Sequence, residues 1–318
     1  MGLEMQHQIG LQEDRGLHLE GSLVFEYINM ETGERRLVDG KNMITTAHKA
    51  QYANFLVGNT VNPPSYLALG TGAIAKYAET NVDTWLALKS TGANSGLGQV
   101  VTTPATGYTL RAVWLYMKRT GATAGSVYVE VQTVSGGLPT GTVVDTSTTV
   151  GTTTIATTAD WVEFQFAARP ALSASTSYAI VLKSTGYTWA SGTTEIFLGV
   201  DQSSPSYSGG AGITWDGSSY TAIATATDCA FRLIADPGAA WTTLIDETTR
   251  KILTSKSLSG STAARLLANF TTSEANDTHG EAALFDASSS GNMWTVIGIK
   301  IKKTSAEALN VYWILTVT

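Results

Sequence analysis

The sequence predicts an all-β protein with two β-sandwich domains and one short helix. Apolar and polar residues alternate along many segments, as where Val127, Val129 and Val131 are interleaved with Tyr128 and Glu130. This period of two is typical of half-buried antiparallel strands. The segments are separated by Gly, Ser and Thr, and charged residues make up only 14% of the chain. A chain of 318 residues is long enough for two domains of about 100–200 residues each.

The N-terminal part of the chain is predicted to contain the only helix. Thr45 or Thr46 is a suitable N-cap, and Gly58 is a suitable residue to follow the end of the helix. The elements expected here are an arm at 1–19, strands at 23–28, 36–38 and 66–69, a helix at 47–57 and a connector at 73–84.

From residue 85 to residue 236 the predicted strands follow one another at shorter intervals, without a helix. About ten strands in roughly 150 residues are typical of a jelly-roll-type sandwich. These strands are expected at 86–89, 98–102, 109–118, 126–134, 142–146, 161–166, 177–184, 194–200, 220–224 and 229–235. In the last segment, 237–318, strands are expected at 243–246, 250–258, 264–270, 281–286, 293–303 and 308–317. The last of these strands is expected to fix the C-terminus in a sheet.

Charge and hydropathy exclude several classes of protein. The formal net charge is −6 and no basic cluster is present, so we expect no nucleic-acid binding. No segment has the ~20 apolar residues of a membrane span, and the N-terminus lacks the apolar region of a secretory signal. The single cysteine, Cys229, lies in a strand-like run and is predicted to be a buried thiol.

No motif predicts catalysis, a cofactor or a metal. His7, His18, His48 and His279 are far apart in the sequence, and His48 is most simply a surface residue of the helix. The turn Gly70-Thr71-Gly72 does not match a phosphate-binding loop. We therefore expect a protein that is not an enzyme, with no catalytic residue, no cofactor and no metal. The loop acids leave one alternative open, a structural Ca²⁺ in place of the favoured turn chemistry; they are Asp201, Asp216 and Asp228.

The aromatic residues fall into two groups. Those on predicted strands are expected in the core: Trp114, Trp161, Phe164, Phe166 and Tyr178. Those in or beside Gly- and Ser-rich loops are candidate contacts: Tyr187, Trp189, Tyr207, Trp215 and Tyr220. Loop aromatics can stack on sugar rings or anchor a protein interface, and they can also pack over the edge of the sandwich. All three interpretations remain open for this group.

Several short motifs lie in the two ends of the chain. The motifs are Lys41-Asn42-Met43-Ile44-Thr45-Thr46, Tyr66-Leu67-Ala68-Leu69-Gly70-Thr71-Gly72, Glu281-Ala282-Ala283-Leu284-Phe285-Asp286-Ala287, Ile299-Lys300-Ile301-Lys302-Lys303-Thr304 and Val311-Tyr312-Trp313-Ile314-Leu315-Thr316-Val317. In residue order and spacing they resemble a family of tailed-bacteriophage structural proteins of the tail, neck or head appendage. The resemblance implies one discontinuous anchoring β-sandwich, formed by 20–84 and 237–318.

The middle of the chain carries a second set of motifs. They include Leu110-Arg111-Ala112-Val113-Trp114-Leu115-Tyr116, Gly137-Leu138-Pro139-Thr140-Gly141 and Trp161-Val162-Glu163-Phe164-Gln165-Phe166. These are similar to the strands and turns of carbohydrate-binding-like jelly rolls. The resemblance implies that 85–236 is a module inserted into a loop of the anchoring domain, which is a favourable place for added chain.

Together, the resemblances imply a structural component of a phage particle, in the neck, tail or capsid appendage. Its expected partners are other copies of itself, other virion proteins and a host-surface glycan, with no nucleic acid and no membrane insertion. Its expected location is the virion, assembled in the host cytoplasm and released by lysis. The inserted module would attach weakly to the glycan or stabilise the particle. The alternative is a cellular carbohydrate-binding accessory module without catalysis.

Overall fold

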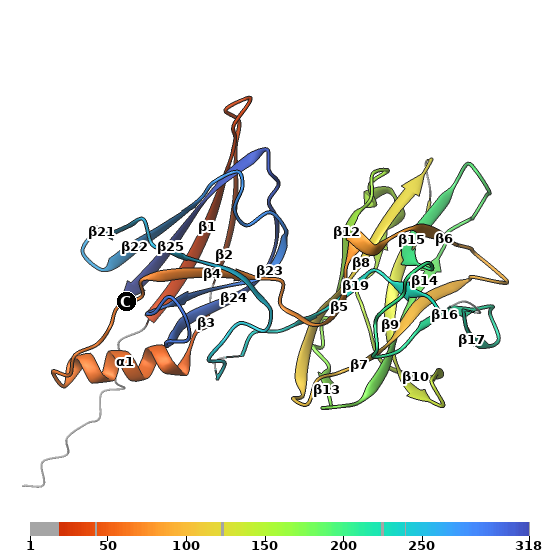
Figure 1. Ribbon diagram of the computed structural model, residues 1–318, viewed down its shortest axis with the longest axis horizontal. Helices are drawn as coiled ribbons and strands as arrows, with labels where there is room; N and C mark the ends of the chain where they lie inside the picture. The colour runs from red at the N-terminus through yellow and green to blue at the C-terminus, as the bar shows by residue number, and fades with distance from the viewer. Residues whose placement is uncertain (1–18, 42, 122–123, 224–225, 239, 318) are drawn as a thin grey trace, which may run out of the picture.

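A computed structural model describes residues 19–41, 43–121, 124–223, 226–238 and 240–317 of the chain. The fold is all-β, with a single α-helix and two short 3-10 helices among these residues, and the strands form two domains connected by two chain segments (Figure 1). No helix in the described ranges is long and apolar enough to cross a membrane. The expected arm at 1–19 lies outside the described residues, apart from Leu19, where the first strand begins.

The first domain contains both ends of the described chain. Its β1 sheet has the order β2-β1-β25-β22-β21 and its β4 sheet the order β20-β4-β23-β24-β3. The elements are β1 (Leu19–Asn29), β2 (Arg35–Lys41), β3 (Met43–Ile44), α1 (Thr46–Leu56), β4 (Tyr66–Gly70), β20 (Glu247–Ile252), β21 (Ser255–Ser259), β22 (Ala263–Phe270), β23 (Thr278–Phe285), β24 (Met293–Lys302) and β25 (Glu307–Val317).

The two sheets of the first domain enclose one apolar core. Alternate residues of β1 and β25 point into it, among them Leu23, Phe25, Val311 and the fully buried Trp313. The β4 sheet contributes Leu67 and its neighbours from the facing side. Strand β25 pairs with β1 on one side and β22 on the other, so the prediction that the last strand is fixed in a sheet is confirmed.

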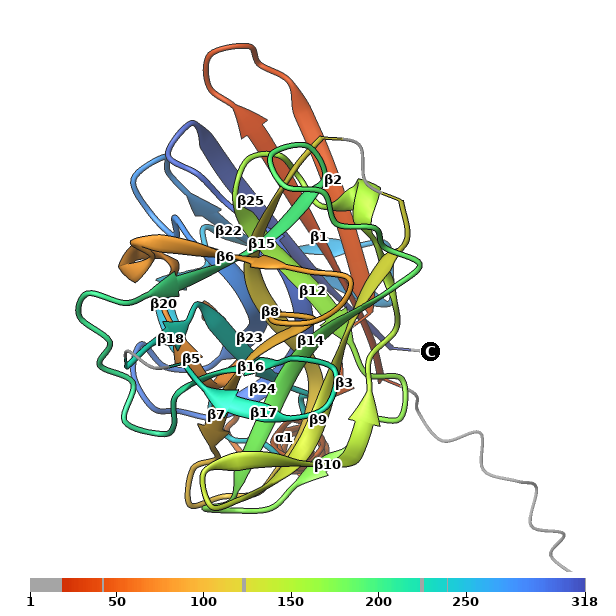
Figure 2. The ribbon, with the colours of Figure 1, turned by 90° about the vertical axis from the view of Figure 1, so that its right-hand side faces the viewer.

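The second domain is formed by the middle of the chain. Its β9 sheet has the order β10-β9-β14-β7-β16-β17, with β11 beside β9, and covers the outer side of the domain (Figure 2). Its β8 sheet has the order β18-β15-β8-β19-β5, with β12 and β13 beside β8 and β6 beside β15. The elements are β5 (Ala73–Tyr77), η1 (Glu79–Asn81), β6 (Thr84–Leu88), β7 (Gly96–Thr102), β8 (Tyr108–Thr120), β9 (Ser126–Ser135), β10 (Leu138–Thr146), β11 (Val150–Gly151), η2 (Thr152–Thr154), β12 (Asp160–Gln165), β13 (Ala171–Leu172), β14 (Ser177–Thr185), β15 (Glu195–Asp201), β16 (Gly212–Trp215), β17 (Tyr220–Ala222), β18 (Asp228–Cys229) and β19 (Phe231–Ala235).

The core of the second domain lies between these two sheets. Val127, Val129 and Val131 of β9 are buried in it, as the alternation predicts. Cys229 is also buried, as expected, and burial raises the pKa of its thiol. The predicted core aromatics are all buried, although Trp114 and Trp161 lie on the other face of the β8 sheet.

Two sequence expectations at the domain boundary are wrong. Residues 73–77 form β5 and pair with β19 in the second domain, so the first domain ends near Gly72 and not at residue 84. Residues 243–246 are not a strand. The backbone N–H groups of Ile245 and Asp246 instead donate to the buried carboxylate of Glu281, at 3.2 and 3.0 Å.

Helix α1 is fixed to the first domain by its N-terminus. The Thr45 hydroxyl accepts the N–H of His48 and donates to the carbonyl of Met293 in β24. The expectation that His48 is a surface residue is wrong, because its ring is buried 4.4 Å from that of Trp294. Burial lowers the pKa of His48 to about 4. The C-terminal end of the helix has no such cover, and Phe55 and Leu56 are exposed.

Candidate functional site

Three of the five predicted contact aromatics pack against the core of the second domain. Tyr187 is buried, and its hydroxyl accepts the N–H of Ile196 at 3.2 Å. Tyr207 is half-buried with its ring edge-on to Phe231 at 5.1 Å, and Trp189 is half-buried against the same core. The interpretation of these side chains as packing over the sandwich edge is the one that the geometry favours.

The other two predicted aromatics form a pair at the edge of the β9 sheet. Trp215 and Tyr220 face each other across the β16–β17 hairpin, with ring centroids 4.3 Å apart. The ammonium of Lys183 lies 5.5 Å from the Trp215 ring, and Gln132 donates to the Tyr220 hydroxyl at 2.7 Å. Both rings are half-buried, so the pair offers a small, partly occupied surface.

The three loop acids hold turns and strands together. Asp201 accepts from the Tyr77 hydroxyl at 2.6 Å, and the buried Asp228 accepts from Gln99 at 3.0 Å. Asp216 accepts the N–H groups of Ser218 and Ser219, and these bonds lower the pKa of its carboxyl. Within the part of the chain that the structure describes, no group of three His, Cys, Asp or Glu side chains could hold a metal ion.

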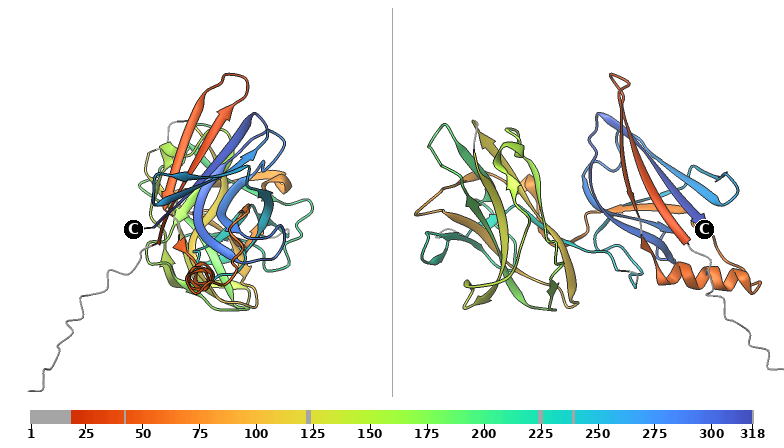
Figure 3. Two further views of the ribbon diagram at one scale, coloured as in Figure 1. Left: turned by 90° about the vertical axis from the view of Figure 1, so that its left-hand side faces the viewer. Right: turned by 180° about the vertical axis from the view of Figure 1, so that it is seen from behind.

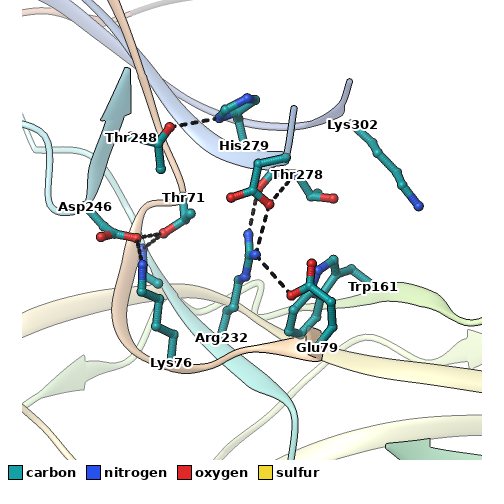
Figure 4. A network of polar contacts seen from close by, with 12 residues as sticks. Thr71, Lys76, Glu79, Trp161, Arg232, Asp246, Thr248, Thr278, His279 and Lys302 are labelled. Atoms are coloured by element: carbon teal, nitrogen blue, oxygen red, sulfur yellow. Dashed lines mark hydrogen bonds and ion pairs between the residues drawn. The ribbon is translucent and has the colours of Figure 1, made fainter. Parts of the chain in front are cut away.

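A network of polar contacts lies at the junction of the two domains (Figure 4). The face of the β8 sheet that carries Trp114 lies against β23 and β24 of the first domain, and Gly280 has no room for a side chain there. A Cβ on Gly280 would be 2.0 Å from the Thr71 carbonyl and 3.4 Å from the Trp114 ring. The two connecting segments also bond to each other, since the Ala235 N–H donates to the Gly72 carbonyl at 3.0 Å.

Arg111 of β8 connects the two domains from a buried position. Its guanidinium donates to the carbonyls of Gly280 and Ile299 in the first domain, at 3.3 and 2.8 Å. On the other side it forms an ion pair with Glu163 at 3.1 Å. Burial lowers the pKa of Arg111. A buried guanidinium needs acceptors of this kind, because its charge is otherwise costly to desolvate, and only its Nε–H has no hydrogen-bond partner among the described residues.

Arg232 of β19 makes a second connection. Its guanidinium donates to the carbonyl of Thr278 at 2.7 Å and to the carboxylate of Asp277 at 3.0 Å, both in the first domain. It also lies 3.5 Å from the Glu79 carboxylate and 4.6 Å from the centroid of the Trp161 ring (Figure 4). The two arginines thus bond to neighbouring parts of β23 and fix the orientation of the β8 sheet.

Lysines of the first domain complete the junction from the other direction. Lys300 donates to the carbonyl of Trp161 at 2.7 Å, and Lys302 forms an ion pair with Asp160 at 2.8 Å. Both lysines lie on β24 and both acceptors on β12, so these two strands are connected side by side. Burial lowers the pKa of Lys300.

A buried carboxylate and a buried histidine lie behind this network. Glu281 accepts backbone N–H groups from the segment 245–246, and burial raises the pKa of its carboxyl to about 7. His279 lies 2.9 Å from the carbonyl of Ala275 through Nε2 and 3.4 Å from the Thr248 hydroxyl through Nδ1, and burial lowers its pKa. Both side chains are enclosed and bonded to the backbone, which is the geometry of structural groups.

The sequence indicates this junction by two arginines that belong to none of the catalytic or binding motifs. Arg111 and Arg232 are single arginines inside otherwise apolar strand segments, Leu110–Leu115 and Ala230–Ala235. Charged residues are almost never fully buried unless they are paired. Such positions therefore indicate a covered sheet face whose cover supplies acceptors. No protein-family model matches the chain and a search of curated proteins gives no match, so the junction is interpreted from its own geometry.

Proposed function

We propose that this protein is a structural component of a tailed-phage particle, with the first domain as its anchor. The observation that carries the proposal is the distribution of exposed apolar side chains. Of ten large apolar side chains exposed among the described residues, eight lie in the first domain and two in the second. The eight are Met30, Leu37, Met43, Phe55, Leu56, Val57, Ile252 and Leu258.

Four of these exposed apolar side chains lie at the end of the first domain that is remote from the second domain. Phe55, Leu56 and Val57, at the end of α1, are 64, 66 and 75% exposed, and Leu258 in β21 is 81% exposed. Helix α1 and β21 both lie on the far side from the second domain (Figure 1), and the left view of Figure 3 looks onto this end. Exposed apolar side chains that gather on one part of a surface mark an interaction site.

The partner that this end favours is a second copy of the chain. Strand β21 is the edge of the β1 sheet, and all five of its residues are exposed. An open edge can accept another strand, and two copies of one edge can pair antiparallel about a twofold axis. The apolar end of α1 would then be covered in the same contact. Self-association by such sheet contacts would suit a role in building a particle.

The second domain would project away from the anchored end. Its proposed role is weak attachment to a host-surface glycan or stabilisation of the particle, without catalysis. Many weak sites on one particle give strong overall attachment. The proposed location is the virion, with assembly in the host cytoplasm and release by lysis, and the proposed partners include other virion proteins.

Substituting the apolar end of the first domain is expected to abolish self-association. The test is the triple variant Phe55→Ser, Leu56→Ser, Leu258→Ser. Each substitution removes about 1.5–3 kcal/mol from the association free energy, because the proposed contact buries that apolar side chain, so association should weaken at least a thousandfold. Sedimentation velocity over a range of concentrations measures the effect. The matched control is the double variant Val143→Ser, Val144→Ser in the second domain, which should form assemblies of the same mass as the native chain does.

Two outcomes would contradict this proposal. A native chain that stays monomeric at every concentration would remove the support for an anchor and favour the accessory module. A triple variant that assembles like the native chain would place the interface elsewhere.

A further inference from the structure

A cleft of about 260 Å³ opens at the edge of the domain junction. The second domain lines it with Glu79, Tyr116, Asp160 and Trp161, and the first domain lines it with Asp277 and Lys302 among others. Figure 4 shows Glu79, Trp161 and Lys302 around the Arg232 contacts. Pockets for drug-sized ligands have volumes of about 300–1,000 Å³. This cleft is slightly smaller, so it has room for one small polar molecule or for a single sugar residue of a larger one.

One wall of the cleft is aromatic. The Tyr116 ring is half-buried and lies 5.4 Å from the Trp161 ring and 6.0 Å from the half-buried Trp85 ring, measured between centroids. The three rings form a row on the face of the β8 sheet, which begins at Trp161 beneath the first domain and continues through Tyr116 to Trp85. The ammonium of Lys118 lies 4.1 Å from the Trp85 ring. An aromatic ring beside polar groups suits a ligand with one apolar and several polar faces.

The other walls keep hydrogen-bonding atoms without partners. Glu79, Asp160 and Asp277 each use one carboxylate oxygen in the contacts described above, and the second oxygen of each has no hydrogen-bond partner among the described residues. These carboxylates are partly exposed, so the hydroxyls of a ligand in the cleft can donate to them.

The charges around the cleft balance. Glu79 and Asp277 pair with Arg232, which is not among the lining residues, and Asp160 pairs with Lys302, while the ammonium of the lining Lys303 bonds to neutral oxygens. The pKa of Tyr116 is raised, first by burial and then by the charge of Glu79. Among the described residues no set of acids is arranged to hold a metal ion. The arrangement therefore selects for a neutral ligand that both donates and accepts hydrogen bonds.

We propose that this cleft binds a residue of a neutral saccharide. The apolar face of the sugar packs on Tyr116, and its hydroxyls donate to Glu79, Asp160 and Asp277. A second sugar residue would continue along the aromatic row towards Trp85. The site needs both domains, because Asp277 and Lys302 come from the first. This inference rests on the glycan-attachment part of the proposed function, and it moves the contact from the loop aromatics to the junction.

The test uses the intact chain and saturation-transfer NMR at millimolar sugar concentrations. The panel contains neutral hexoses, N-acetylhexosamines and their disaccharides, with uronic acids as charged controls. Binding of neutral members should weaken at least about tenfold in Tyr116→Ala and in Asp160→Asn, because a hydrogen bond to a charged group is lost in the second. Tyr116→Phe keeps the ring and should change the affinity by about threefold or less. The indole N–H resonance of Trp161 is assigned as the one that the Trp161→Phe variant lacks. It should shift when sugar is added to the native chain, because Trp161 lines the cleft.

The control variant is Trp215→Ala, Tyr220→Ala, which should bind as the native chain does. Binding that survives the cleft variants and is lost in this control would overturn the cleft and keep glycan attachment. Binding of the uronic acids alone would overturn the neutral class. No saturation transfer from any sugar would overturn both the cleft and glycan attachment, whereas self-association is decided separately by sedimentation. Unchanged thermal midpoints of the variants would show that lost binding is not lost folding.

Discussion

Replacing Arg111 with alanine is expected to lower the free energy of unfolding by about 3–5 kcal/mol, as for other buried charges that lose a partner. The substitution leaves the carbonyls of Gly280 and Ile299 without their donor in a buried place. It also removes the cation that faces Glu163, whose carboxylate then keeps, among the described residues, only the indole N–H of Trp114 and the amide of Gln165. These groups lie at the junction, so the loss should fall on the contact between the domains.

Urea denaturation followed by tryptophan fluorescence measures this loss. The native chain should unfold in a transition in which the domains are coupled, and the variant should show two separated transitions because the junction no longer connects them. The control is Arg265→Ala, an exposed arginine whose guanidinium lies 4.2 Å from the Tyr312 ring, with an expected loss of about 1 kcal/mol or less. A loss of the same size in both variants would show that Arg111 does not connect the domains.

Strand alternation carries most of the information about this fold. It predicts β9 and β25 because each has one buried and one partly exposed side, and the pattern of a single strand is enough to show this. It fails at β5, where a short apolar segment beside a glycine turn belongs to the other domain. It also fails at 243–246, where backbone donors bond to the Glu281 side chain in place of a neighbouring strand. Partner choice of this kind depends on residues that are distant in sequence.

The candidate site was less predictable for a related reason. A pattern of buried positions does not say what covers them, and Trp114 and Trp161 are covered by the first domain and not by the facing sheet. Tyr187 follows a glycine in a Ser- and Thr-rich loop, yet its ring turns inward and its hydroxyl joins the backbone of neighbouring segments. The composition of a loop therefore does not predict whether its aromatic side chains point into the core or out to solvent. The cleft combines residues more than 100 positions apart, which no local motif contains.

The second large effect is expected on the pH dependence of stability, through Glu281. Its folded-state pKa of about 7 lies above the ordinary value of 4.5, because the carboxyl is buried and only backbone N–H groups offset its desolvation. The folded state therefore holds the proton more tightly than the unfolded state between these values. The contribution of this group to stability is largest below pH 4.5, falls as the pH rises through 7 and is then constant. Integrated over this range at about 1.4 kcal/mol per pH unit, the fall is roughly 3 kcal/mol.

The native curve alone does not isolate Glu281. His48 and His279 have lowered pKa values, so the unfolded state binds their protons more tightly, and their contribution rises with pH up to about 6.5. The measurement is therefore the difference in unfolding free energy between Glu281→Gln and the native chain from pH 5 to pH 8. The variant cannot ionise at this position, so it should gain about 2.5 kcal/mol relative to the native chain from pH 5 to pH 8. Asp216→Asn is the control, since its carboxylate is held ionised by the N–H groups of Ser219 and Ser218 and its difference should not change with pH. A flat difference for Glu281→Gln as well would mean that water reaches the carboxylate, and the domain junction around Gly70 and Gly280 would then be open in solution and not closed.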